Sequence, residues 1–176
     1  MPPLWNTWTI PKRTNDDMNL TVYTVGAISG LGYEECVNQF NVRADRLRKM
    51  GYDVLHPLLG KSILRNETKL RAQGYNCPIS CNHAITMTDF WRVDKADILF
   101  VDLTNAQVNV SIGSVAEMSR GFAKGKMIVT VMQEENIHRH AFVIEMSSVV
   151  FTTLDEAYEY FEYYADALDR NRKEKK

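Results

Sequence analysis

Short apolar runs alternate along the chain with longer segments in which apolar residues recur at helical spacing. The runs have the length of β-strands and are 20–28 (LTVYTVGAI), 52–57 (YDVLHP), 96–103 (ADILFVDL), 127–132 (MIVTVM) and 149–151 (VVF). Helical spacing predicts helices over 33–50, 83–95 and 111–124 and from about Thr153 onward. Strands that alternate with helices form a parallel sheet with right-handed crossovers. The pattern therefore predicts an α/β fold, with a five-stranded parallel sheet and helices on both faces.

The segments before and after the second predicted strand, 33–50 and 58–82, differ in their pattern. Residues 58–82 show no period and are rich in Arg, Lys, Asn and Gln, and a loop of this length in a compact domain is commonly a functional lid. Gly51 follows the helix predicted over 33–50, where a left-handed capping residue is favoured. That helix has one apolar face, formed by Tyr33, Cys36, Val37, Phe40, Ala44 and Leu47.

The length of 176 residues suits one domain. Residues 1–18 contain prolines and tryptophans without periodicity, and we expect them to form an extended N-terminal arm. Residues 19–168 form the single predicted domain. Residues 169–176 end in RNRKEKK and are expected to form a charged, solvated tail.

The overall charge is nearly balanced, with 21 Lys and Arg against 22 Asp and Glu, for a formal net charge of −1. Binding to a nucleic-acid polymer needs a basic face, so we exclude such a partner and expect single small molecules instead. The sequence shows no signal peptide and no run of the ~20 apolar residues that span a membrane. We therefore expect a cytoplasmic protein without membrane contact.

The three cysteines, Cys36, Cys77 and Cys81, are expected to be free thiols, because their number is odd and no secretion signal precedes them. Cys77 and Cys81 lie near His83, but the spacing is loose and no second Cys/His pair follows to complete four zinc ligands. We expect neither a metal nor a cofactor.

Small molecules bind to open parallel sheets outside the carboxyl ends of the strands, and the stretch 102–117 leads from such an end into a helix. Ser111 is the expected N-cap, so the helix amides and the positive dipole end would face the ligand. The Glu117 side chain leans back over Gly113 and Ser114, and Gly113 leaves room for a flat ring. We expect the dipole to keep Glu117 ionised, as attack on an anomeric carbon requires.

The same helix allows a second interpretation, in which Glu117 is a surface residue that faces water. Periodicity alone leaves the two interpretations of Glu117 equal. In the second one, Glu117 lies off the expected buried face, which consists of Ile112, Val115, Ala116, Phe122 and Ala123.

Two linked motifs make the first interpretation more specific. Residues 111–117 have the pattern S-x-G-x-x-x-E, and residues 121–129 continue with G-x-A-x-x-K-x-I-V. Together with the opening VYTVGAISG, they resemble the nucleoside 2-deoxyribosyltransferase superfamily, which includes the 2′-deoxynucleoside 5′-phosphate N-hydrolases. The resemblance extends over residues 21–165 and implies a flavodoxin-like (Rossmann-like) fold.

The resemblance also implies a set of catalytic residues. Glu117 matches the nucleophile, and Tyr23 matches the residue that holds its carboxylate. Asp89, eight residues before Asp97, matches the second acid, which contacts or protonates the leaving base. The less favoured alternative for Asp89 is an acid in the N-terminal turn of a helix, stabilised by the helix dipole. The residues expected to bind the substrate are Gly26, Ile28, Ser29, Asp102, Ser111, Gly113, Ser114, Asn136 and His138.

The loop that contains His138 and His140 raises the question of a metal, but two histidines two residues apart in a loop are weak evidence for one. Substrate contact or hydrogen bonding within the loop is the preferred interpretation. The corresponding loop of the family reaches into a neighbouring subunit, so the resemblance implies a homodimer or a higher homo-oligomer.

The implied reaction is cleavage or exchange of the N-glycosidic bond of a (deoxy)nucleoside or nucleotide, through a covalent glycosyl-Glu117 intermediate. Ser111 stands where transferases often have an acid, which favours a 5′-monophosphate hydrolase. Ser29 stands where the hydrolases tend to have a basic residue, which favours a transferase that uses a free base as its second substrate. If a phosphate is bound, we expect it at Ser29, Ser111 and Ser114, with help from Arg65 or Arg71.

Two further functions remain open from the sequence. One is a nucleotide-sensing module on the same fold, since one scaffold hosts many functions. The other is a phosphoribohydrolase, whose helix start has the pattern G-G-x-G-T-x-x-E. IGSVAE lacks these paired glycines, which disfavours the second alternative.

Overall fold

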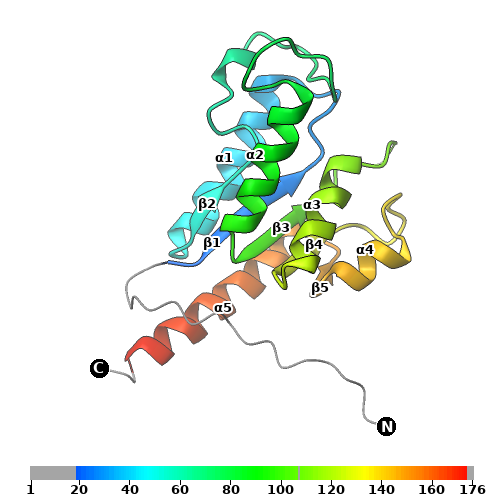
Figure 1. The fold of residues 1–176 in the computed structure, drawn as a ribbon. Helices are drawn as coiled ribbons and strands as arrows, with labels where there is room; N and C mark the ends of the chain where they lie inside the picture. Colours follow the sequence, from blue (N-terminus) through cyan, green and yellow to red (C-terminus); the bar gives the residue numbers. More distant parts are fainter. Residues whose placement is uncertain (1–18, 107, 174–176) are drawn as a thin grey trace.

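The computed structural model describes residues 19–106 and 108–173, and the expected N-terminal arm lies outside them. Five strands form one sheet in the order β2-β1-β3-β4-β5, and every neighbouring pair is parallel (Figure 1). The strands are β1 (Thr21–Gly26), β2 (Asp53–Leu55), β3 (Ile98–Asp102), β4 (Met127–Val131) and β5 (Val149–Phe151). This sheet confirms the predicted α/β flavodoxin-like fold.

Within residues 19–106 and 108–173, five α-helices and one 3₁₀-helix connect and follow the strands. The short apolar segment before β5, to which the pattern assigns no structure, is the helix α4. The last helix, α5, continues to Lys173 and so enters the segment expected as a tail. The helices are α1 (Tyr33–Lys49), η1 (Ser62–Leu64), α2 (Asn82–Lys95), α3 (Ile112–Ala123), α4 (Ala141–Met146) and α5 (Leu154–Lys173).

Different helices cover the two faces of the sheet. α1 and α5 lie on one face, where Leu47 and Phe161 pack with Phe100 of β3. α2, α3 and α4 lie on the other face, where Met118 of α3 packs with Leu99. Because side chains alternate along a strand, the neighbours Leu99 and Phe100 belong to opposite cores. β3 is therefore buried along its whole length, as its unbroken apolar run predicts.

The buried face of α1 agrees with the prediction at all positions except Val37 and Arg43. The expected apolar face is buried except for Val37, which is half-buried, and Arg43 is buried with it. Arg43 is tolerated there because it forms an ion pair with Asp102 at the end of β3. Gly51 has φ 90°, which confirms the left-handed residue expected after the helix.

The buried face of α3 differs from the prediction. Ile112 and Phe122 are 78% and 56% exposed, although they were expected to be buried. The helix instead turns Met118 into the core and places Gly121 against Leu99, where the missing side chain allows its backbone to approach β3 closely. The residues buried along α3 are Ser114, Glu117, Met118 and Gly121.

The segment 58–82 packs against the helix α1. Leu64, Leu70 and Tyr75 join a small core with Phe40 of α1. Two backbone hydrogen bonds also connect Leu70 to the loop after β1, from Gly30 N to Leu70 O and from Leu70 N to Leu31 O, both 2.7 Å. The segment expected as a lid is thus fixed to the loop after β1.

Within the described residues, no helix combines the length and the apolar character that crossing a membrane requires.

We expect Gly121→Ala to destabilise the fold. A Cβ at this position would lie 2.8 Å from Leu99 Cδ2, and Leu99 is fully buried. Overpacking of this kind costs about 1–3 kcal/mol, more than the ~1 kcal/mol that alanine gains over glycine in a helix. Urea unfolding measures the change in the free energy of unfolding.

Gly113→Ala in the same helix is the matched control, because no atom lies within 4 Å of a Cβ at Gly113. This variant should be as stable as the natural chain or more stable. An equal gain in both variants would contradict the close packing of α3 on β3.

Candidate active site

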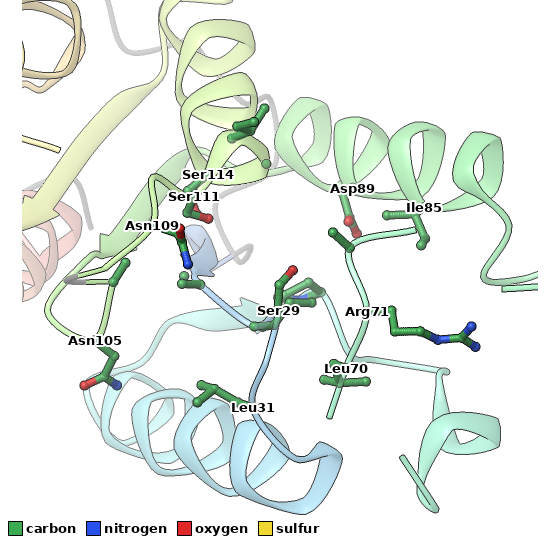
Figure 2. A pocket seen from close by; sticks show the side chains of 18 of the residues that line it. Ser29, Leu31, Leu70, Arg71, Ile85, Asp89, Asn105, Asn109, Ser111 and Ser114 are labelled. Atoms are coloured by element: carbon green, nitrogen blue, oxygen red, sulfur yellow. The ribbon is translucent and has the colours of Figure 1, made fainter. Parts of the chain in front are cut away.

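A cavity of about 840 Å³ opens at the carboxyl ends of the strands. It lies where the chain leaves β1 in one direction and β3 in the other, the switch point at which open α/β sheets bind small molecules. Figure 2 shows Ser29 from the loop after β1, Leu70 from the segment after β2, and Ser111 from the start of α3 around one space. The volume suits a ligand of nucleotide size.

Glu117 of α3 lies in the wall of this cavity and is only 8% exposed. Tyr23, on the inner strand β1, donates a hydrogen bond of 2.6 Å from its hydroxyl to Glu117 Oε1. Tyr23 is fully buried behind the carboxyl group and does not line the cavity. The structure therefore brings together the two residues that the resemblance pairs, and Glu117 does not face bulk water.

Burial raises the pKa of Glu117 to about 8, and the nearby Asp89 adds to the rise. The hydrogen bond from Tyr23 and the positive charges of Lys61 and Arg92 act in the opposite direction. This rise opposes the expectation that the helix dipole keeps Glu117 ionised. Removal of the carboxylate from water outweighs a dipole whose effect fades beyond the first turn.

Asp89 of α2 is the second carboxyl group of the cavity, and Figure 2 shows it pointing from the helix into the space. Its Oδ1 accepts a hydrogen bond of 2.7 Å from Arg92 and lies 3.7 Å from Lys61 Nζ. Burial raises the pKa of Asp89, and the two cations oppose the rise. None of the described residues hydrogen-bonds to the other oxygen, Oδ2, which leaves it available to a ligand.

The start of α3 is held differently from the expected N-cap. Ser111 occupies the N-cap position, but its side chain makes no capping hydrogen bond and its Oγ lies 2.9 Å from Ser114 Oγ. Both hydroxyls line the cavity. Gly113 also lines it, and nothing lies within 4 Å of a Cβ there. The open space expected above this glycine is present.

His138 and Asn136 lie behind the cavity wall and do not line the cavity. The amide of Ser111 donates to His138 Nε2 at 2.7 Å, so Nδ1 carries the ring proton and donates to Asn136 Oδ1 at 2.9 Å. Asn136 Nδ2 in turn donates to Leu103 O at 2.8 Å. In this geometry the two residues, expected to bind substrate, position the start of α3.

Asp102 is likewise a support for the loop after β3. One of its oxygens pairs with Arg43, and the other accepts hydrogen bonds from the amide and the hydroxyl of Thr104, at 2.9 and 2.6 Å. Asp102 does not line the cavity, whereas the other expected residues of the first loop, Gly26, Ile28 and Ser29, do.

Several cavity residues have no signal in the sequence pattern. Lys61 comes from the aperiodic segment after β2, and Asn105 and Asn109 come from the loop after β3. Of the two arginines considered for a phosphate, Arg71 lines the cavity and Arg65 does not. The Arg71 guanidinium lies over the Tyr75 ring at 4.3 Å and points away from Ser111 in Figure 2.

The cysteines are free thiols in the structure, with Cys36 buried and Cys77 and Cys81 half-buried. No group of three or more His, Cys, Asp or Glu side chains able to hold a metal ion occurs among the described residues.

No protein-family model matches the chain, and no curated protein is significantly similar to it in sequence. Solved structures share its fold. A conserved protein from Enterococcus faecalis V583 superposes with a TM-score of 0.57, at 15% identity, over 84% of this chain and 99% of that one.

Two further solved structures have names that describe an activity. The CMP N-glycosidase of Clostridium botulinum has a TM-score of 0.52 at 15% identity, over 82% of this chain and 98% of its own. The 2-deoxyribosyltransferase of Bacillus psychrosaccharolyticus has a TM-score of 0.52 at 15% identity, over 78% and 90%. At this identity the likeness confirms the fold implied by the resemblance to the nucleoside 2-deoxyribosyltransferase superfamily.

The raised pKa of Glu117 predicts a pH-dependent stability. Between pH 4.5 and about 8 the folded chain keeps a proton on Glu117 that the unfolded chain has lost, so this residue makes the fold less stable as pH rises. Glu117→Gln removes the titration and keeps an oxygen for Tyr23. The variant should therefore become progressively more stable than the natural chain from pH 5 to pH 8.5, as measured by urea unfolding.

Glu159→Gln on the exposed side of α5 is the control and should show no such trend. A difference between Glu117→Gln and the natural chain that stays constant with pH would contradict the buried, protonated carboxyl group.

Proposed function

We propose that this chain is an enzyme that cleaves or exchanges the N-glycosidic bond of a nucleoside or nucleotide, with Glu117 as its nucleophile. The observation that supports this most directly is the pair of carboxyl groups, the buried Glu117 and the half-buried Asp89, that line one cavity from two different helices. Such a pair can divide the work, since one carboxylate must attack the sugar and another acid must supply a proton to the leaving base.

In the proposed mechanism, the Glu117 carboxylate bonds to the anomeric carbon as the bond to the base breaks. Tyr23 holds Oε1 through its hydrogen bond, so that the carboxylate keeps one orientation during attack. Asp89, whose pKa is raised by burial, carries the proton for the base nitrogen. The covalent glycosyl-Glu117 then passes the sugar to water or to another base.

The names of two neighbours in fold support this reaction class, because one is a CMP N-glycosidase and the other a 2-deoxyribosyltransferase. A nucleotide-sensing module is a weaker alternative, since simple binding gives no reason to bury two carboxyl groups beside the ligand. The homo-oligomer and the cytoplasmic location expected from the sequence stay predictions.

A 5′-monophosphate substrate is the second candidate within this class. Three serine hydroxyls, those of Ser29, Ser111 and Ser114, line the cavity near the N-terminus of α3. Hydroxyls and free helix amides are suitable ligands for a phosphate. The Arg71 side chain would have to turn from Tyr75 to take part.

The reaction class is tested by incubating the protein with nucleosides, 2′-deoxynucleosides and their 5′-monophosphates, with and without a free acceptor base. Free base released without an acceptor indicates hydrolysis, and a new nucleoside formed only with an acceptor indicates transfer. Chromatography separates these products, and intact-protein mass spectrometry detects the covalent glycosyl-enzyme. No turnover of any substrate would overturn the proposed function.

Glu117→Ala should abolish activity, with a loss of at least about 10³-fold as for other covalent nucleophiles. Glu159→Ala on the exposed side of α5 is the control that should retain activity. Full activity of a folded Glu117→Ala variant would contradict the assigned nucleophile.

Tyr23→Phe should move the pH dependence of the reaction. The hydrogen bond from Tyr23 lowers the pKa of Glu117, so its loss raises that pKa further. If attack needs the carboxylate, the ascending limb of kcat/KM against pH shifts to higher pH, and the loss of activity is larger at pH 7 than at pH 9.

Tyr52→Phe is the matched control, since Tyr52 also donates a buried hydrogen bond, to Phe161 O, on the face covered by α1 and α5. It should leave the pH profile in place. An unchanged pH profile in Tyr23→Phe would contradict the influence of Tyr23 on the ionisation of Glu117.

A further inference from the structure

Lys61 is a buried lysine in the wall of the same cavity as Glu117 and Asp89, and it is only 5% exposed. Its backbone is fixed on both sides, because Lys61 N donates to Leu58 O at 3.1 Å and Leu64 N donates to Lys61 O at 2.9 Å. The ammonium group is therefore held at the cavity by an anchored stretch of chain.

The Lys61 ammonium makes no hydrogen bond of ordinary length to any of the described residues. The nearest carboxylate oxygen is Asp89 Oδ1 at 3.7 Å, and this oxygen already accepts a hydrogen bond of 2.7 Å from Arg92. Arg92 also donates to Pro57 O and Leu59 O, at 3.1 and 2.8 Å, so its own donors are engaged. A buried ammonium with unused donors is costly unless a ligand accepts from it.

The charges around Asp89 also indicate that the Lys61 ammonium is available to a ligand. Arg92 makes the direct contact with the Asp89 carboxylate, and Lys61 is a second cation at the cavity wall, close enough to act on Glu117 as well. Burial lowers the pKa of Lys61, which makes its N–H groups stronger donors, while Asp89 opposes the shift. A cation placed in this way favours a ligand atom on which negative charge develops during the reaction.

The leaving base has such an atom, if the proposed function holds. When the C1′–N bond breaks, its electron pair stays on the base nitrogen and spreads to any ring carbonyl oxygen conjugated with it. We propose that Lys61 is a catalytic residue whose ammonium donates a hydrogen bond to a ring carbonyl oxygen of the leaving base. The lysine keeps its proton, the sugar carbon bonds to Glu117, and the base nitrogen takes the proton of Asp89.

This role defines a substrate class. Uracil, thymine, cytosine, guanine and hypoxanthine have a ring carbonyl oxygen, and adenine has none. The enzyme should therefore prefer nucleosides or nucleotides of the carbonyl bases, and this preference should depend on Lys61.

The test compares the natural chain with Lys61→Met on substrates whose bases differ in how well they bear negative charge. For uracil substrates, kcat/KM should fall by about 10- to 100-fold, the range expected for a lost hydrogen bond to a charged group, mainly through kcat. For 5-fluorouracil substrates the fall should be clearly smaller, because the fluorine already stabilises the anion. Hypoxanthine substrates should likewise lose more activity than adenine substrates.

Two variants separate chemistry from structure. Lys61→Arg keeps a cationic donor and should retain most of the preference, whereas Lys69→Met changes an exposed lysine of the same segment and should change nothing. Thermal unfolding confirms that each variant is folded. A merely structural role would lower the activity on all bases by one common factor.

The outcomes are distinguishable from a failure of the proposed function. Turnover by the natural chain with equal losses for all bases in Lys61→Met, or with no loss, would overturn the role of Lys61 alone. Absence of turnover on every substrate would overturn the proposed function and this role with it.

Discussion

The buried contact between Tyr23 and Glu117 is the constraint on which the rest of the site depends. It joins the inner strand β1 to the helix α3, and it requires the helix to lie close to the sheet. Gly121 permits this approach, because even one methyl group there would contact Leu99. Removing the carboxyl group from water raises its pKa, and the hydrogen bond from Tyr23 and two nearby cations offset part of that cost.

A second layer of buried polar groups fixes the loops around this contact. Asp102 holds the chain as it leaves β3 through Arg43 and Thr104. His138 and Asn136 hold the next turn by accepting from the Ser111 amide and donating to the Leu103 carbonyl. Satisfied networks of this kind rigidify a structure, since each member would be costly if left unpaired. Asp102, Arg43, Asn136 and His138 thus support the cavity wall without lining the cavity themselves.

Charge balance distinguishes the two carboxyl groups. Among the described residues, Asp89 has Arg92 in direct contact and Lys61 nearby, whereas the hydrogen-bond partner of Glu117 is the neutral hydroxyl of Tyr23. The two cations favour the charged form of Asp89, while burial favours a proton on Glu117, so the proposed reaction requires this proton to pass from Glu117 to Asp89 before attack. Lys61 has no close hydrogen-bond partner among the described residues and is available to the ligand.

The order and type of the main elements follow from the sequence alone, because periods of 2 and 3.6 residues mark strands and helices and alternating elements impose a parallel sheet. The same reasoning finds Gly51 and the strand-end segments where the cavity lies. The pairing of Glu117 with Tyr23 was predicted as well, but only through the resemblance of the motifs to a family.

Only the tertiary structure decided what burial does to those residues. Local periodicity ranks side chains by hydrophobicity, so it placed Ile112 and Phe122 inside, whereas the face of α3 that lies against the sheet contains Ser114, Glu117, Met118 and Gly121. Periodicity gave no signal for Lys61, because no buried face can be predicted for an aperiodic segment. The ionisation of Glu117 also depends on desolvation by residues distant in the chain, and no local pattern contains that information.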